Sequence, residues 1–304
     1  MDPRPSGPFS QAISRRSFTG ALTTTGMLGG QAPAQASAPS KAAELVPLGK
    51  TGVKVTRLAQ GTGFNGGARS SAHTRLGEKA FQALIRHDLE QGVTFMDAAD
   101  LYGSHPYLRN ALRGVPREKY TILTKLWPRT EFWNTFSGGA KAEVDRFRKE
   151  FATDHLEIVL IHCLMNDRWT GELQRTMDEL AELKQKGVVK AVGVSCHDFG
   201  ALKVAAASPW TDILLVRINH VGKAAAMDAS VEEVVPVIKQ AKAAGKGIIG
   251  MKIFGAGKLT TPEQRDASLK FVFQNNLVDA VTIGMLNEEQ IDDTVMRINK
   301  AMAA

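Results

Sequence analysis

The stretch VTFMDAADLY, residues 93–102, decides the fold of this chain. It begins as an apolar β-strand and ends on a carboxylate, Asp97, with a phenol, Tyr102, in the loop that follows. Side chains alternate between the two faces of a strand, so Val93, Phe95 and Asp97 share one face and only the last is charged. Burying a charge costs free energy unless a partner compensates it. We therefore expect an oppositely charged group at the end of a neighbouring strand.

Two later strands end in the same manner. In the strand expected at residues 120–126 the side chains of one face end on Lys125, and in the strand expected at 156–164 they end on His162. Parallel neighbouring strands would bring this carboxylate, amine and imidazole together beside Tyr102. Such a set of groups predicts a proton-transfer site.

The strand-helix pattern occurs eight times along the chain. Strands are expected at residues 57–62, 93–98, 120–126, 156–163, 189–195, 213–219, 247–254 and 280–284, and helices at 78–91, 106–113, 140–151, 171–186, 199–207, 231–244, 262–275 and 288–302. The strands are continuous apolar runs, as in parallel sheets that helices cover on both faces. We predict a (β/α)8 TIM barrel with an N-terminal β-hairpin at residues 48–55. A doubly wound open sheet is disfavoured because no G-x-G-x-x-G motif follows the first strand.

Residues 1–36 have the pattern of a twin-arginine export signal. Arg15 and Arg16 precede a weakly apolar run at 19–30, and small residues offer a cleavage site after Ala36. We expect a periplasmic or otherwise exported protein with the twin-arginine translocase as a partner; the alternative is a disordered tail with two chance arginines. The apolar run is shorter than the ~20 residues of a membrane-spanning helix, so no stable membrane insertion is expected.

A linker at 37–45 and a single barrel domain at 46–304 account for the remaining residues. The composition, 43% apolar and 23% charged over 304 residues, is that of a globular protein. The formal net charge is +7, and loss of a leader with three arginines and one aspartate lowers it to +5. No block of basic and aromatic residues accompanies this surplus, so nucleic-acid binding is not expected. Cys163 and Cys196 are either small buried hydrophobic residues or a disulfide between neighbouring strands, and no metal site is expected.

The polar groups at the strand ends suit a proton donor. A free phenol has a pKa of about 10, too high for an efficient acid at neutral pH, and a neighbouring ammonium group lowers it. We predict that Lys125 lowers the pKa of Tyr102 and that Asp97 holds Lys125 in place. Tyr102 then acts as general acid and His162 orients a substrate carbonyl.

Over residues 46–304 the sequence resembles the aldo/keto reductase family. The resemblance is carried by LGKTG at 48–52, FMDAADLYG at 95–103, TK at 124–125, IH at 161–162, VGVS at 192–195, GAGKL at 255–259 and EQIDD at 289–293. Its most specific feature is Asp97 with Tyr102 five residues later, followed by Lys125 and His162 on the next two strands. The resemblance implies a catalytic tetrad of these residues and hydride transfer between NADP or NAD and a small carbonyl compound or sugar.

Cofactor binding is expected near the ends of the later strands, where TIM barrels usually bind phosphates. The expected cofactor-binding residues are Ser195, Met251, Lys252, Phe254, Gly255, Gly257, Lys258, Gly284, Gln290 and Asp293. Four positions depart from the family pattern. The loop at 103–106 lacks the usual Glu, Cys196 replaces an Asn for the nicotinamide carboxamide, Met251 replaces a stacking aromatic, and Gln290 replaces a base for the adenosine phosphate. We therefore expect NAD to be used at least comparably with NADP.

Four aromatic residues follow the first, third and fourth strands: Phe64, Trp127, Trp133 and Trp169. As a group they predict an apolar or sugar-stacking substrate pocket, although any one of them could instead pack beneath a loop. The sequence thus predicts an exported NAD(P)-dependent oxidoreductase that reduces an aldehyde or ketone, or oxidises the alcohol. A non-catalytic nucleotide-sensing subunit and a cofactor-assisted sugar epimerase or lyase are alternatives on the same barrel.

Overall fold

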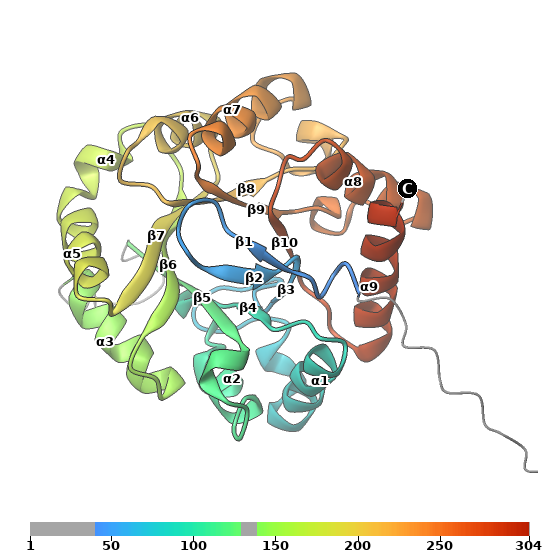
Figure 1. Cartoon of the computed structure of the whole chain (residues 1–304), viewed down its shortest axis with the longest axis horizontal. Helices are drawn as coiled ribbons and strands as arrows, with labels where there is room; N and C mark the ends of the chain where they lie inside the picture. Colours follow the sequence, from blue (N-terminus) through green and yellow to red (C-terminus); the bar gives the residue numbers. More distant parts are fainter. Residues whose placement is uncertain (1–39, 129–138, 304) are drawn as a thin grey trace, which may run out of the picture. The chain divides into compact units, whose positions relative to one another are not determined.

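Eight parallel strands form a closed barrel in the computed structural model, which describes residues 40–128 and 139–303 (Figure 1). Around the barrel the strands follow the order β10-β3-β4-β5-β6-β7-β8-β9. Their bounds are β3 Leu58–Gly61, β4 Phe95–Asp97, β5 Thr121–Leu126, β6 Leu156–Leu164, β7 Val189–Cys196, β8 Ile213–Arg217, β9 Gly247–Met251 and β10 Ala280–Ile283. The predicted (β/α)8 architecture is confirmed.

Helices surround the barrel on its outer side (Figure 1). They are α1 Glu78–Glu90, α2 His105–Ala111, α3 Ala140–Phe151, α4 Trp169–Glu172, α5 Gln174–Gln185, α6 Phe199–Ala207, α7 Val231–Ala243, α8 Pro262–Gln274 and α9 Glu288–Ala303. The apolar stripe of each long helix faces the strands; in α1 it includes Phe81, Leu84 and Ile85. Within the described residues no helix is long and apolar enough to cross a membrane.

Alternation along the strands divides the apolar side chains into two clusters. Phe95, Leu123 and Ile158 belong to a cluster inside the barrel, whereas Met96 lies in the larger cluster between strands and helices. The predicted inward faces of β4, β5 and β6 are therefore confirmed. Val93 is an exception: it precedes β4 and packs in the outer cluster, so it does not share the face of Asp97.

The predicted N-terminal hairpin, β1 Leu45–Pro47 and β2 Lys54–Thr56, closes the amino-terminal end of the barrel. Its inward side chains, Val46, Leu48, Val53 and Val55, belong to the inner cluster. The amide of Lys50 donates to the carbonyl of Gly245 at 2.8 Å. Gly49 has a φ of +55°, and a Cβ there would lie 2.4 Å from the amide nitrogen of Gly247. Only glycine fits such a close contact, so the hairpin sits directly on the start of β9.

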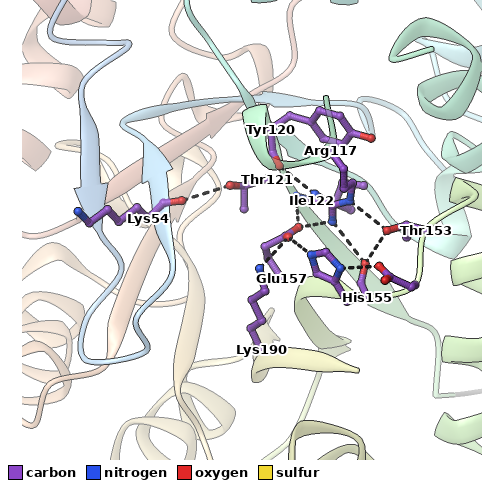
Figure 2. Close-up of polar contacts among 10 residues, drawn as sticks. Lys54, Arg117, Tyr120, Thr121, Ile122, Thr153, His155, Glu157 and Lys190 are labelled. Atoms are coloured by element: carbon purple, nitrogen blue, oxygen red, sulfur yellow. Dashed lines mark hydrogen bonds and ion pairs between the residues drawn. The ribbon is translucent and has the colours of Figure 1, made fainter. Parts of the chain in front are cut away.

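A polar cluster joins the amino-terminal ends of β5, β6 and β7 (Figure 2). Glu157, which is 5% exposed, accepts hydrogen bonds from Arg117 at 2.6 Å and from the amide of Ile122 at 3.0 Å. Lys190 and His155 contact its other oxygen at 3.3 and 3.0 Å. Burial alone would raise the pKa of Glu157, but Arg117 and the Ile122 amide hold it below its usual range. This end of a barrel contributes stability rather than chemistry.

Most boundaries differ from the sequence expectation by one or two residues, and two larger differences have a visible cause. The strand expected at 247–254 ends at Met251, because Lys252 turns into the left-handed region with a φ of +57°. The helix expected at 171–186 is interrupted at Leu173, which separates the short α4 from α5.

Candidate active site

The four residues predicted to form the proton-transfer site meet at the carboxyl end of the barrel. Lys125 on β5 donates hydrogen bonds from Nζ to Asp97 at the end of β4 and, at 2.9 Å, to the carbonyl of Ala98. Tyr102 ends the short helix η2, Asp100–Tyr102, and its hydroxyl lies 3.4 Å from Nε2 of His162 on β6. Lys125 Nζ lies 4.8 Å from the centre of the Tyr102 ring. All four side chains line one pocket.

Asp97 has a second partner that the sequence did not suggest. Thr282, on β10, donates from Oγ1 to the other carboxylate oxygen of Asp97 at 2.7 Å. β10 lies beside β3, the neighbour of β4, because the barrel is closed. Both oxygens of the carboxylate are therefore engaged, and the direction of Asp97 toward Lys125 is fixed. The only sequence signal was an inward Thr at the end of the last strand.

The electrostatics of Tyr102 differ from the expectation that Lys125 lowers its pKa. Burial raises the pKa of Tyr102, and the negative charge of Asp97 raises it further. Burial also lowers the pKa of Lys125, although Asp97 opposes this effect. The reason is that the charge of Lys125 is balanced by direct contact with Asp97. Tyr102 is consequently held as the protonated phenol, the form that can donate.

The loop after β3 packs directly against the phenol. A Cβ on Gly63 would lie 2.2 Å from Cζ of Tyr102, and one on Gly66 would lie 2.9 Å from Cδ1 of the same ring. Only residues without a side chain allow this approach, so these glycines fix one wall around Tyr102. The sequence reasoning did not single them out, since glycine loops are common beyond strands.

The loop at 103–106, which lacks the usual Glu, is held by a different set of polar groups. His105 Nδ1 contacts Glu150 at 2.7 Å, and its Nε2 contacts Thr124 at 2.8 Å. Arg146 bonds to Glu150 at 2.6 Å and to Asp100 at 2.9 Å. Asp100 starts the short helix that carries the Tyr102 phenol, so the network anchors that helix to α3 and β5.

The pocket has a volume of about 360 Å³ and extends from the tetrad to α8 and α9. Nine predicted cofactor or substrate residues line it: Phe64, Ser195, Met251, Lys252, Phe254, Gly257, Gly284, Gln290 and Asp293. Gly255 and Lys258 do not. A Cβ on Gly255 would lie 3.0 Å from Cβ of Ala225, and Lys258 donates to the carbonyl of Ala224 at 3.1 Å on the exposed side of its loop.

Arg265 on α8 is a lining residue that the sequence reasoning missed. Its guanidinium lies 5.6 Å from the centre of the Phe254 ring and 3.8 Å from Asp293 Oδ2. Gln290, aligned with a family base, instead accepts from the amide of Leu286 at 2.9 Å. Arg265 lies on α8, between the family motifs at 255–259 and 289–293, so the sequence carried no signal for it.

The four predicted pocket aromatics have different positions. Phe64 lines the pocket, and Trp127 packs edge-on to His162 with ring centres 5.4 Å apart. Trp169, 1% exposed, packs against Trp210 in the outer core and is not a lining residue of this pocket. Trp133 lies outside the described residues.

The two cysteines are free thiols, so the disulfide alternative is not realised. The amide of Cys163 donates to Ser195 Oγ at 2.7 Å, which ties the end of β6 to β7. Cys196 is buried, and burial raises the pKa of its thiol. Among the residues that the structure describes, no group of three or more His, Cys, Asp or Glu side chains could hold a metal ion.

Known proteins resemble this chain in both sequence and structure. The 6-dehydroglucose reductase of Agrobacterium fabrum is 33% identical over 145 residues, which cover 41% of this chain and 47% of that protein. The chain spans about half the length of the curated relatives that it matches first. A Pseudomonas aeruginosa protein described as an aldo-keto reductase has 26% identity and a TM-score of 0.70, covering 86% of this chain and 98% of its own.

A Klebsiella pneumoniae aldo-keto reductase in complex with NADPH shares the fold, with 17% identity and a TM-score of 0.60 over 84% of this chain and 89% of its own. Residues 58–270 match the model of the Aldo/keto reductase family. This match covers well over half of the sequence and contains all four tetrad residues, so the chain belongs to the aldo/keto reductase family.

Proposed function

We propose that the protein reduces the carbonyl group of a small aldehyde or ketone with a nicotinamide dinucleotide, or oxidises the alcohol, and that Tyr102 is the general acid. The observation that carries this proposal is the pair formed by the Tyr102 hydroxyl and His162 Nε2, 3.4 Å apart in the pocket beside Lys125 and Asp97. A carbonyl oxygen that faces both groups from the pocket can accept a hydrogen bond from each of them.

The tetrad residues then have distinct roles. When bound, a reduced nicotinamide would supply the hydride that the carbonyl carbon accepts. Tyr102 donates its phenolic proton to the carbonyl oxygen, so that an alcohol and a phenolate result. The ammonium group of Lys125, with its Nζ 4.8 Å from the ring centre, opposes the effect of burial and of Asp97 on this phenolate without reversing it. His162, in the tautomer with a proton on Nε2, polarises the carbonyl by donating to its oxygen.

The lining residues fit a dinucleotide. The pocket reaches from the tetrad to an arginine at α8, and the intervening turn η5, Gly255–Gly257, carries no large side chain. Ser195 and Met251 would hold the nicotinamide end, and Arg265 with Phe254 would hold the adenosine end. The positive charge of Arg265 suits the phosphates of NADP or NAD, a cofactor choice that membership of the family supports.

Consumption of the cofactor distinguishes this function from its alternatives. The purified protein would be incubated with NADPH or NADH and a panel of aldehydes, ketones and oxidised sugars, the last suggested by the Agrobacterium relative. The proposal predicts that one nucleotide is oxidised for each alcohol seen by NMR. Nucleotide binding without turnover would indicate a sensor, and conversion of a sugar without net nucleotide oxidation would indicate an epimerase or lyase.

We also propose that the protein is exported through the twin-arginine route. The proposal is supported by Arg15 and Arg16 ahead of a weakly apolar run and by small residues that end at Ala36. This route carries folded proteins, which suits an enzyme that needs a bound nucleotide.

A further inference from the structure

Lys252 is a cation in the active-site pocket that the proposed proton transfer does not use. It follows β9 directly, with a φ of +57°, a conformation that long side chains rarely adopt. Its carbonyl oxygen accepts hydrogen bonds from the amide of Gly255 at 2.8 Å and from Asn219 Nδ2 at 3.2 Å. The two adjoining loops therefore fix its backbone, and its side chain lines the pocket with Lys125 and His162.

Neighbouring cations already have acidic partners. Lys125 contacts Asp97, and Arg217 lies 3.0 Å from Asp228. Among the described residues, the ammonium group of Lys252 has neither an ionic nor a hydrogen-bonding partner. Burial lowers the pKa of Lys252, and the positive charge of Arg217 lowers it further. A partly buried, unpaired ammonium group costs free energy, and an anionic ligand would offset that cost.

We propose that Lys252 binds an anionic oxygen of the substrate, so that the natural substrate is an aldehyde or ketone that also carries an acidic group such as a carboxylate. The inference rests on the proposed function and names the substrate class of the same site.

The surroundings of Lys252 favour the substrate over the other anion that would enter the pocket, the nucleotide diphosphate. The ionisable groups that influence the pKa of Lys252 include Lys125 and Cys163. Cys163 also influences the pKa of Tyr102. Lys252 and Cys163 therefore both lie at the catalytic end of the pocket. The far end has its own cation, Arg265, which lines the pocket there and lies 3.8 Å from Asp293.

A matched pair of substrates tests this inference. 4-Carboxybenzaldehyde and methyl 4-formylbenzoate have the same reactive group and similar shape, but only the first is an anion at neutral pH. Wild type should show a higher kcat/KM for the acid than for the ester. Lys252→Met should lower the acid-to-ester ratio by about 10- to 100-fold, the worth of one charge-assisted hydrogen bond. Lys252→Arg should retain most of the ratio.

Lys239→Met is the control for net charge, because Lys239 is exposed on α7 and does not line the pocket. It should leave the ratio unchanged. Fluorescence titration of each variant with NADPH supplies the second readout. If Lys252→Met weakens nucleotide binding and reduces turnover of both aldehydes equally, the lysine serves the diphosphate and the inference fails. An unchanged acid-to-ester ratio would also overturn it.

Calorimetry in the presence of oxidised nucleotide measures binding of both aldehydes without turnover, and therefore separates this inference from the proposed function. Suppose that wild type reduces neither compound but binds the acid more tightly than the ester, and that Lys252→Met abolishes this difference in affinity. Such a result would support the anion site and contradict the proposed reductase activity. Reduction of both compounds with a ratio that Lys252→Met does not change would contradict the anion site alone.

Discussion

Replacing Lys125 with methionine should lower the stability of the protein, because it leaves the buried carboxylate of Asp97 without its cation. It should also slow catalysis, because it removes the ammonium group beside Tyr102. Lys125 is 1% exposed and the side chain of Asp97 is 7% exposed, so the ion pair is buried. Loss of one partner of a buried pair costs about 3–5 kcal/mol. Asp97 would keep the hydrogen bond from Thr282, which places the expected loss near the lower limit, about 3 kcal/mol. Urea denaturation followed by circular dichroism measures this loss.

A second substitution distinguishes the stranded charge from lost packing. In the double variant Asp97→Asn with Lys125→Met, no charge remains to be compensated, so most of the lost stability should return. Reduction of carbonyl compounds should not return, because no ammonium group stabilises the phenolate of Tyr102. This reasoning would be refuted if the free energy of unfolding of Lys125→Met were within about 1 kcal/mol of that of wild type. It would also be refuted if the double variant were less stable than Lys125→Met.

Three further variants test other parts of the molecule. Asp88 is buried without a partner among the described residues, and burial raises its pKa above the ordinary 3.8, so stability should fall as the pH rises above about 4. Asp88→Asn should remove this loss of stability. If the free energies of unfolding of Asp88→Asn and wild type differed by the same amount at pH 5 and pH 8, the prediction would be contradicted. Arg265→Gln should weaken NADPH binding about 10- to 100-fold and NADH binding less; equal losses in titrations of both nucleotides would exclude an adenosine-phosphate contact. Changing Arg15 and Arg16 to lysine should leave the precursor unexported in cell fractionation, and undiminished export would disprove the twin-arginine proposal.

The acid-base groups could be predicted because the signal was local. Asp97, Lys125 and His162 each end an inward file of apolar side chains, and strand alternation alone identifies such a file. Closure of the barrel then brings the ends together. Trp169 was predicted to line the substrate pocket but packs in the outer core against Trp210. Its position in the sequence after a strand does not indicate whether its side chain turns inward or outward.

The remaining features depend on contacts between distant segments. Thr282 reaches Asp97 only because the last strand closes the barrel beside the first. The raised pKa of Tyr102 reflects burial and the balanced charge of Lys125, neither of which a sequence displays. Lys252 was expected to bind phosphate, but the turn that ends β9 and the absence of an acidic partner among the described residues appear only in three dimensions.

Tyr102→Phe tests the central claim most directly. The substitution removes only the phenolic hydroxyl, so folding and nucleotide affinity should stay near wild type in denaturation and fluorescence titrations. Reduction of a carbonyl compound that wild type turns over should fall about 10²- to 10⁴-fold, the usual contribution of a positioned general acid. Retention of the wild-type rate by Tyr102→Phe would contradict the assignment of this tyrosine as the proton donor, and with it the proposed mechanism.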